Sequence, residues 1–298
     1  MSESTHQLAP VASTSAAALK RVCPLRERTT ATTTLNIAPA PWVVRQCSET
    51  GMVFLENPPG YASLQSELAW EVTWQREADA RAAAAPTLYA LSRAMKSFRQ
   101  RVLKRNKVAA MATAIVRGSP SERVNLLDLG CGEGQLLGLV MDRLAPAQRQ
   151  RCVPHGVEIS NELARRADAA LRVHGGRCVH ASALEGLAGF DDDYFDLIVL
   201  ASFLEHEIQP LPLLRECARR LRTGGHVLIK VPNHASWNRH LRGARWCGYR
   251  WPDHVNYFTP QTLAAMAQAA GLVVERMNLL DRFAFSDSLY AVLRSPAR

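Results

Sequence analysis

Short apolar runs alternate with amphipathic stretches along the chain from Arg123 onward. Apolar runs bounded by turn residues are typical of buried strands, and apolar residues that recur every three or four positions are typical of helices. The pattern predicts strands at 124–129, 152–158, 177–180, 195–201 and 226–231, and helices at 134–144, 161–173 and 211–221. A chain that alternates in this way is expected to form a parallel sheet with helices on both faces.

The same pattern continues towards the end of the chain. A further helix at 260–270 ends at Gly271, and glycine suits the left-handed conformation found at helix C-termini. Apolar segments at 272–280 and 288–293 predict two terminal strands. The predicted fold class is therefore α/β, with a Rossmann-like, mostly parallel sheet.

The first 118 residues follow a different pattern. Residues 1–20, rich in Ser, Thr and Ala, are predicted to be a disordered tail. Between 21 and 60, short β-like pieces at 42–45 and 52–55 flank a turn that ends in Gly51. Helical periodicity at 64–85 and again after Pro86 predicts a helical linker or cap over 61–118, before an α/β domain at 119–298.

The net charge of +9 has its densest source in the second helical stretch. A helix that packs through its apolar face and exposes a solvated basic face is the favoured interpretation. A contact with nucleic acid or anionic lipid is the alternative. The stretch contains these basic residues and no acid: Arg93, Lys96, Arg99, Arg101, Lys104, Arg105 and Lys107.

Cysteine content and hydropathy indicate the compartment. No apolar run reaches the roughly 18 residues that a membrane span needs. The N-terminus has no basic start followed by an apolar block, so no secretory signal is predicted. Seven cysteines are an odd number in a chain of 298 residues, which is too long to depend on disulfides. We therefore expect free thiols and a cytoplasmic location.

The predicted strand that ends at Leu129 leads directly into a glycine-rich turn, Gly130-Cys131-Gly132-Glu133-Gly134, and then into a helix. Glycines at such a turn let the backbone approach a ligand and present amide hydrogens at a helix N-terminus. The next strand ends at Glu158, where an acid can accept hydrogen bonds from ribose hydroxyls. A third turn, at Ser182 and Ala183, follows at the same sheet edge. Together the three turns predict a nucleotide-like cofactor.

The spacing of the glycines distinguishes between two cofactor classes. The dinucleotide fingerprint has its third glycine where this chain has Gln135. Asp128 precedes the first glycine, and a carboxylate there repels a pyrophosphate but suits a ligand with an amino group and a sulfonium. This charge pattern favours S-adenosylmethionine over NAD, with a tight turn that binds no ligand as the remaining alternative.

Several segments of the chain resemble the motifs of class I methyltransferases and occur in the same order. The resemblance is greatest to the group that includes the ubiquinone-biosynthesis-type O-methyltransferases. The resemblance covers about residues 106–294 and implies a seven-stranded sheet whose last strand is antiparallel. It also implies S-adenosylmethionine as the cofactor. The segments are 126–134, 156–160, 195–200, 203–206 and 221–229.

The resemblance implies roles for individual residues. Asp128 would lie near the methionine amino group, and Glu158 would hold the ribose. The group usually has an acid near the adenine amino group where this chain has Ser182, which could contact adenine through its hydroxyl or backbone. The rest of the expected cofactor lining is Gly130, Cys131, Gly132, Gly134, Ile159, Ala183 and Ala201.

The segment at 21–60 resembles a zinc ribbon that has lost half of its ligands. Some members of the group carry two Cys-x-x-Cys knuckles before the catalytic domain. Here Cys23 is followed by Arg26 and Cys47 by Thr50 at the positions of the second cysteines. Two thiolates do not make a closed tetrahedral zinc site. We therefore expect no zinc in the ribbon, and the sequence predicts no other metal ligands.

A long segment at 232–259 lies where the ligand crevice of an open α/β sheet is expected, beyond the carboxyl ends of the strands. We expect a loop without secondary structure. Two interpretations stay open: a local hydrophobic cluster that fixes the loop, or a pocket for a planar or apolar substrate. Its aromatic residues are Trp237, Trp246, Tyr249, Trp251, Tyr257 and Phe258.

His206 and His254 are the candidate general bases. Methyl transfer to a hydroxyl benefits from a base with a pKa near neutrality, and the ordinary pKa of histidine meets that condition. Asp253 is expected to orient either ring. The structural alternatives are that His206 stabilises the loop after the fourth strand and that His254 fixes its own loop through a hydrogen bond.

These observations predict a methyltransferase that uses S-adenosylmethionine and acts on a small molecule, at an oxygen of an aromatic or lipid-like compound. An RNA or protein methyltransferase that uses the basic helix at 93–107 is the alternative. The segment Ala201-Ser202-Phe203-Leu204 does not resemble an Asn-Pro-Pro-Tyr base-methylating signature, which disfavours a nucleic-acid substrate. A non-catalytic binding module is disfavoured by the intact glycine loop and Glu158. The sequence leaves the oligomeric state open.

Overall fold

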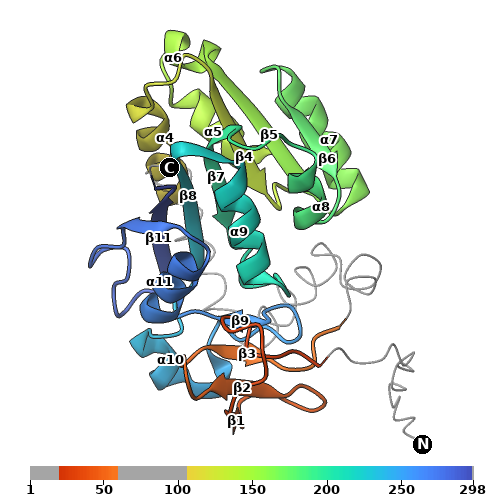
Figure 1. Cartoon of the computed structure of the whole chain (residues 1–298), viewed down its shortest axis with the longest axis vertical. Coiled ribbons are helices and arrows are strands. Elements are labelled where there is room, and N and C mark those ends of the chain that lie inside the picture. Colours follow the sequence, from red (N-terminus) through yellow and green to blue (C-terminus); the bar gives the residue numbers. More distant parts are fainter. Residues whose placement is uncertain (1–19, 60–105, 297–298) are drawn as a thin grey trace, which may run out of the picture.

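A seven-stranded sheet lies at the centre of the computed structural model, which describes residues 20–59 and 106–296 (Figure 1). The strand order is β10-β11-β8-β7-β4-β5-β6. β11 runs antiparallel to both of its neighbours, and the other pairs are parallel. The strands are β4 (Val124–Leu129), β5 (Cys152–Glu158), β6 (Arg177–His180), β7 (Phe195–Ala201), β8 (Leu221–Pro232), β10 (Val273–Arg276) and β11 (Ser288–Arg294).

The predicted α/β fold with its antiparallel last strand is confirmed. The predicted strands at 124–129, 152–158, 177–180 and 195–201 have those bounds in the structure. The strand predicted at 272–280 is too long, because β10 ends at Arg276. Asn278 then starts a turn in which its carbonyl oxygen accepts a hydrogen bond from the Asp281 amide (3.0 Å).

Alternating side chains of the strands build a hydrophobic core on each face of the sheet. On β7, Leu197 and Val199 pack with α4 and α5, whereas Ile198 and Leu200 pack with α8, α9 and α11. Such alternation follows from the two-residue period of a strand. The helices on the two faces are α4 (Lys107–Gly118), α5 (Gln135–Asp142), α6 (Pro146–Gln150), α7 (Asn161–Arg172), α8 (Ala183–Ala188), α9 (Pro210–Arg220) and α11 (Pro260–Ala269).

A second, four-stranded sheet joins the N-terminal segment to the rest of the chain (Figure 1). Its order is β1 (Thr32–Leu35), β2 (Val44–Cys47), β3 (Val53–Leu55) and β9 (Asn256–Tyr257), with every pair antiparallel. We call β1, β2 and β3 the ribbon. The short strand β9 comes from the segment after β8, so residues some two hundred positions apart share one sheet.

The expectation of a loop without secondary structure at 232–259 is wrong. This segment contains α10 (Trp237–Arg242), the 3₁₀ turn η1 (Gly243–Arg245) and β9. Trp246 and Tyr257 are fully buried and pack with Val44, Val53 and Leu55 of the ribbon, and Tyr249 and Trp251 pack against the same cluster. These aromatic side chains therefore attach the segment to the ribbon, whereas Trp237 is 58% exposed.

The side chain of Arg21 is buried where three segments meet. Its guanidinium donates hydrogen bonds to the carbonyl oxygens of Leu55 (3.2 Å), Val255 (2.9 Å) and Ile208 (2.8 Å), and to Oδ1 of Asn256 (2.8 Å). A buried guanidinium is stable only when its donors find such acceptors. Arg21 thus connects the ribbon, β9 and the segment that follows β7.

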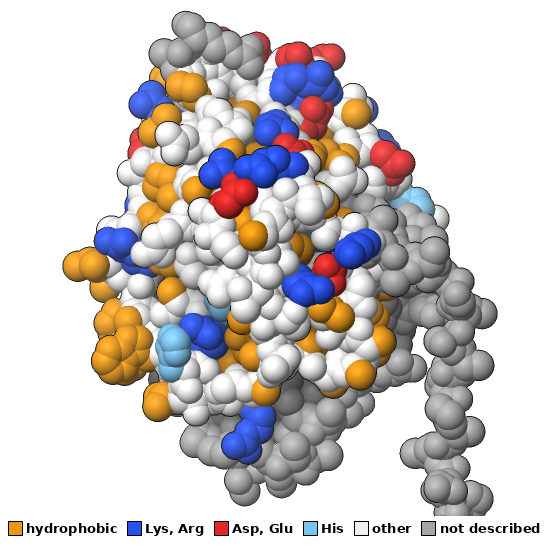
Figure 2. All heavy atoms as spheres, turned by 60° about the horizontal axis from the view of Figure 1, so that its bottom comes forward, with side chains coloured by type: hydrophobic (Ala, Val, Ile, Leu, Met, Phe, Trp, Pro, Cys, Tyr) orange, Lys and Arg blue, Asp and Glu red, His pale blue; other side chains and the backbone are white. Residues whose placement is uncertain are grey.

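Several predictions concern residues outside the described ranges: most of the tail at 1–20, the helix at 64–85, and the basic stretch from Arg93 to Arg105. Lys107, the last basic residue of that stretch, begins α4 and forms an ion pair with Asp281 (2.9 Å). On the face shown in Figure 2, Lys and Arg side chains are scattered among other side chains and form no single patch. None of the helices at 20–59 and 106–296 is long and apolar enough to span a bilayer.

Replacing Arg21 by Met should lower the free energy of unfolding by about 3 kcal/mol, because buried carbonyl oxygens lose a charged donor. Urea unfolding followed by circular dichroism measures this change. Arg28→Met is the matched control, since Arg28 is exposed and pairs with Glu49 at the surface, where ion pairs contribute little. Equal stability of the two variants would show that Arg21 does not hold the ribbon.

Candidate functional site

The glycine loop after β4 has the backbone conformation that its sequence requires. Gly130, Gly132 and Gly134 have φ of 68°, 56° and 80°, in the left-handed region where glycine alone is free of Cβ strain. The amides of Gly130 and Cys131 donate to the carbonyl oxygen of Val157 at the end of β5 (2.9 and 3.2 Å). The loop is therefore anchored to the neighbouring strand, and Gly134 leads directly into α5.

The space around two of these glycines differs. A Cβ atom at Gly130 would lie 2.4 Å from Cδ2 of Phe203, so the ring of Phe203 packs directly against the loop. A Cβ at Gly132 would meet no atom within 4 Å. One side of the loop is thus closed by protein, while the backbone at Gly132 faces open space that a ligand can approach.

Glu158, at the end of β5, is buried beside the loop. Its Oε2 accepts a hydrogen bond from the Gly132 amide (2.9 Å), and its Oε1 accepts one from the Ser160 amide (3.0 Å). These contacts hold the carboxylate in one orientation at the carboxyl edge of the sheet. From the sequence we expect the acid at this position to accept hydrogen bonds from ribose hydroxyls. The fixed carboxylate at the edge of the sheet is consistent with that expectation.

Asp128 is buried in β4, one residue before its end. Burial, and secondly the charge of Glu158, raise the pKa of Asp128 from its ordinary range to about 8. A carboxyl in this setting is stabilised as an anion only when a cationic group comes close to it. Asp128 therefore suits a ligand that carries an ammonium group.

The remaining predicted cofactor residues lie around the same edge. Ser182 caps α8, and its hydroxyl donates to Oε2 of Glu185 (2.7 Å), which gives it a structural role. Ala183 is buried beneath it, and Ala201 is the last residue of β7. The carbonyl oxygen of Ile159 contacts Nε2 of His180 (3.1 Å).

The thiol of Cys131 lies within the glycine loop and contacts the thiol of Cys178 on β6, with 3.6 Å between the sulfur atoms. A Cβ at Gly156 would lie 2.5 Å from the Cys131 sulfur, so the glycine at that position of β5 makes room for the pair. The neighbouring thiol of Cys178, and secondly burial, raise the pKa of Cys131. The sequence assigned Cys131 to the cofactor lining but gave no signal for Cys178.

The chain turns sharply at Ser202, directly after β7. Ser202 has φ of 61°, an uncommon conformation for a residue other than glycine. Its amide donates to the carbonyl oxygen of Lys230 (2.8 Å). The turn places Phe203 against Gly130 and brings the following residues, Glu205 and His206, to the carboxyl end of the sheet.

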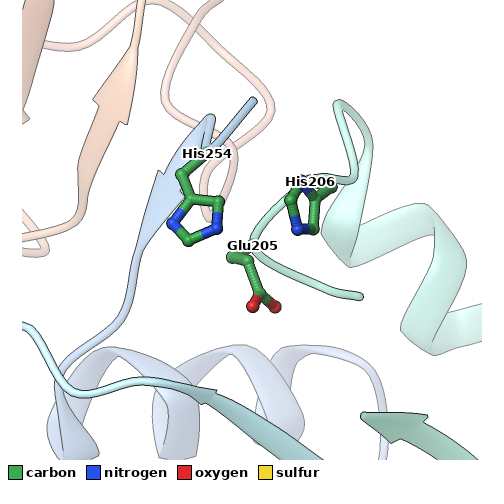
Figure 3. Close-up of side chains that lie close together, drawn as sticks. All are labelled: Glu205, His206 and His254. Atoms are coloured by element: carbon green, nitrogen blue, oxygen red, sulfur yellow. The ribbon is translucent and has the colours of Figure 1, made fainter. Parts of the chain in front are cut away.

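Glu205, His206 and His254 come together from two segments (Figure 3). One potential ligand atom of each lies within 4.8 Å of those of the other two. The two imidazole rings contact each other edge to face, with centroids 4.7 Å apart. The sequence predicted His206 and His254 but missed Glu205, although the Glu-His pair was part of the motif at 203–206.

Backbone carbonyl oxygens fix both imidazole rings. Nδ1 of His206 donates to the carbonyl oxygen of Asp253 (2.9 Å), and Nδ1 of His254 donates to that of Gly248 (2.8 Å). A carbonyl oxygen can only accept, so each neutral ring carries its proton on Nδ1 and its lone pair on Nε2. Asp253 thus contacts His206 through its main chain, and its carboxylate contacts Arg250 (3.4 Å).

Burial determines the protonation of this cluster. It lowers the pKa of His206 to about 4 and that of His254 well below its ordinary value, with the charge of Arg250 acting in the same direction on both. Burial also raises the pKa of Glu205 to about 7, against the opposing charge of Lys230. Both rings are consequently neutral at neutral pH, with their Nε2 lone pairs available.

Cys23 and Cys47 each contact a threonine hydroxyl, and Thr50 stands at one of the positions where a zinc ribbon has a second cysteine. Sγ of Cys23 lies 3.6 Å from Oγ1 of Thr50, and Sγ of Cys47 lies 3.3 Å from Oγ1 of Thr30. Cys23 and Cys47 are buried, with Met52 and Phe54 in the same core. Thiol–hydroxyl contacts and apolar packing therefore surround both cysteines, and the expectation of no zinc stays a prediction.

The chain was compared with known protein families and solved structures. The family model described as "Methyltransferase domain" matches residues 88–276, more than half of the 298-residue chain. A solved structure from Galdieria sulphuraria, proposed to be a sarcosine dimethylglycine methyltransferase, has a TM-score of 0.50 at 16% identity and covers 66% of this chain and 88% of that one. Its similarity concerns the fold.

Two curated relatives match parts of the chain. A ubiquinone biosynthesis O-methyltransferase of Cupriavidus pinatubonensis is 29% identical over 51% of this chain and 61% of its own length. A bifunctional methionine biosynthesis protein MetXA/MetW of Rhodopirellula baltica is 35% identical over 37% of this chain and 17% of its own length. The chain thus matches less than two thirds of either relative.

Replacing Asp128 by Asn should stabilise the ligand-free protein at neutral pH. A carboxyl whose pKa rises on folding contributes stability that is complete below its unfolded pKa of about 3.9 and is lost as the pH rises through about 8. The stability of the parent relative to Asp128→Asn should therefore fall by roughly 2.6 kcal/mol between pH 5 and pH 7. Urea unfolding at both pH values measures it, and a difference independent of pH would show that the carboxyl is ionised throughout.

Proposed function

The chain belongs to the methyltransferase domain family, and from that membership we propose that it transfers a methyl group to an oxygen atom of a small aromatic or lipid-like acceptor. S-adenosylmethionine is the methyl donor. The ubiquinone biosynthesis relatives are named as O-methyltransferases, which supports oxygen as the acceptor atom at 27–29% identity. The observation that carries the proposal is the pair of oriented, neutral histidines, one of which follows closely after Phe203, the residue packed against the glycine loop.

The loop and the two buried acids fit the donor. The open space at Gly132 leaves room for a ligand against the backbone. Glu158 presents a fixed carboxylate for ribose hydroxyls, and Asp128 presents one that needs a cationic partner. When bound, S-adenosylmethionine supplies an electrophilic methyl group on a sulfonium, which becomes a neutral thioether once the acceptor has taken that group.

The histidine pair acts on the acceptor. A hydroxyl group is a poor nucleophile until its proton is removed, and positioning of the two reactants supplies much of the remaining rate. The Nε2 atoms of His206 and His254 carry lone pairs that can accept this proton. Their rings cannot turn freely, because each Nδ1 is bound to a backbone carbonyl oxygen. Phe203 links this end of the site to the glycine loop, so donor and acceptor sides are adjacent.

Binding of S-adenosylhomocysteine tests the donor side. Calorimetry should show one site per chain, and Asp128→Asn should raise the dissociation constant about thirtyfold or more, because the ammonium group of the ligand loses a buried charge partner. Asp142→Asn is the matched control, since Asp142 is an exposed residue at the end of α5. Equal affinity of both variants would contradict the assignment of Asp128.

Methyl transfer to catechol tests the acceptor side. His206→Gln should lower kcat about a hundredfold or more and leave the affinity for S-adenosylhomocysteine unchanged, because the change removes a proton acceptor and no donor contact. His174→Gln, in the turn after α7 at the opposite edge of the sheet, is the control. Methylation of the nitrogen of aniline with none of the oxygen of catechol would contradict oxygen as the acceptor atom.

A further inference from the structure

A cavity of about 490 Å³ opens at the edge of the central sheet where its strands begin, at the opposite end of β4 from the glycine loop. Among its lining residues, Arg123, Gly176 and Tyr194 directly precede β4, β6 and β7. We propose that this cavity binds a small organic phosphate, in which a phosphate group is joined to a planar ring. The cavity is separate from the residues assigned to methyl transfer, so this proposal goes beyond the proposed function and does not rest on it.

Positive charge dominates the lining of the cavity. Its described lining residues include three arginines (Arg123, Arg172 and Arg177) and a single acid, Asp191. A guanidinium is planar, and its N–H donors match the oxygen atoms of a phosphate. A phosphate monoester carries about 1.5 to 2 negative charges at neutral pH. The excess of arginines over acid therefore suits the charge of such a ligand.

The guanidinium groups are positioned and have donors left for a ligand. Nη2 of Arg177 donates to the carbonyl oxygen of Gly189 (3.3 Å), and its guanidinium carbon lies 4.9 Å from the centroid of the Phe190 ring. A guanidinium has five N–H donors, and this hydrogen bond uses one of them. Arg172 pairs with Asp168 through Nε, which does not use its two terminal nitrogens. Both arginines can thus bind an anion without giving up their present contacts.

His155, in the interior of β5, gives a second indication. It is 5% exposed and lines the cavity. Its Nε2 lies 3.2 Å from the Tyr194 hydroxyl, whereas its Nδ1 is buried without a hydrogen-bond partner among the described residues. Burial, followed by the charges of Arg177 and Arg123, lowers the pKa of His155 to about 4. A buried polar atom normally has a partner, and a bound anion supplies acceptor oxygens while it counters the charge of both arginines.

The size and the aromatic part of the lining indicate more than a bare phosphate. Sites for small organic molecules have volumes of roughly 300–1,000 Å³, and this cavity falls in that range. The half-buried ring of Tyr194 and the buried ring of Phe190 line it, with their centroids 5.8 Å apart. Aromatic side chains pack well against planar rings. The ligand is therefore assigned a planar ring next to its phosphate group.

The cavity and the cofactor site lie at different parts of β5. His155 lines the cavity, and Glu158, three residues later, ends the strand beside the glycine loop. A ligand in the cavity therefore does not occupy the position proposed for S-adenosylhomocysteine. Both compounds can bind at the same time, which makes the two sites separable by experiment.

Calorimetric titration of the full chain with phenyl phosphate tests the site, once with saturating S-adenosylhomocysteine and once without it. One equivalent per chain should bind with the same affinity in both titrations, because the two sites are separate. Inorganic phosphate should bind about tenfold more weakly, since it lacks the ring that packs against Tyr194. Equal affinity for inorganic phosphate and phenyl phosphate would overturn the assignment of an organic ligand.

Two arginine variants locate the site. Arg123→Gln and Arg177→Gln should each raise the dissociation constant of phenyl phosphate about tenfold or more, because each removes a charged donor. Arg165→Gln is the matched control and should bind as the parent does, since Arg165 is exposed on α7, pairs with Glu162 and does not line the cavity. Arg123 is exposed, so its replacement leaves the fold intact, and circular dichroism checks both variants.

The outcomes separate this proposal from the proposed function. If phenyl phosphate does not bind, or if Arg123→Gln binds it as the parent does, the phosphate site is wrong and the donor and acceptor assignments are unaffected. If phenyl phosphate binds while S-adenosylhomocysteine does not, the phosphate site stands and the donor side of the proposed function fails. A short single-stranded RNA that binds while phenyl phosphate does not would assign the arginines to a nucleic-acid backbone and overturn the small-molecule ligand.

Discussion

A single buried guanidinium fixes the geometry of the site from outside the catalytic sheet. Arg21 donates to Leu55 of the ribbon, to Asn256 of β9 and the preceding Val255, and to Ile208 after β7. Asn256 extends these contacts, since its Nδ2 donates to the carbonyl oxygens of Leu204 (3.0 Å) and Glu207 (2.6 Å). Hydrogen bonds from a charged donor contribute about 1.5–3 kcal/mol each, so these contacts hold the junction firmly. The segment with Glu205 and His206 is therefore positioned by the ribbon as much as by the sheet.

Contacts with the rest of the chain hold the ribbon and the segment before it on two sides. Cys23 and Cys47 contact threonine hydroxyls and pack in the main core. The cluster of Trp246, Tyr257 and Leu55 buries the other side. The edge of β3 pairs with β9, which begins two residues after His254. The ribbon therefore supports the segment that carries this histidine.

The strands and the glycine loop could be predicted from the sequence because they depend on local rules. The apolar runs at 124–129 and 195–201 are buried on both faces, and the glycines at 130, 132 and 134 are required by their backbone conformation. The acceptor side depends on contacts that no local pattern reveals. β9 has only two residues and pairs with a strand about two hundred positions earlier. The sequence around Glu205 does not indicate that this acid is buried. Asp253 contacts His206 through its carbonyl oxygen, a group that every residue has.

The pairing of β3 with β9 has a consequence for synthesis of the protein on the ribosome. The ribbon emerges before the central sheet, with the edge of Val53–Leu55 that faces β9 unpaired and its apolar residues Val44 and Val53 uncovered. Their partners, Tyr257 and Trp246, follow only after nearly all of the central sheet has been translated. At about 5–20 residues per second, this interval lasts on the order of ten seconds or more, during which an open strand edge can pair wrongly. This long-range pairing therefore ties completion of the four-stranded sheet to synthesis of the segment that carries His254.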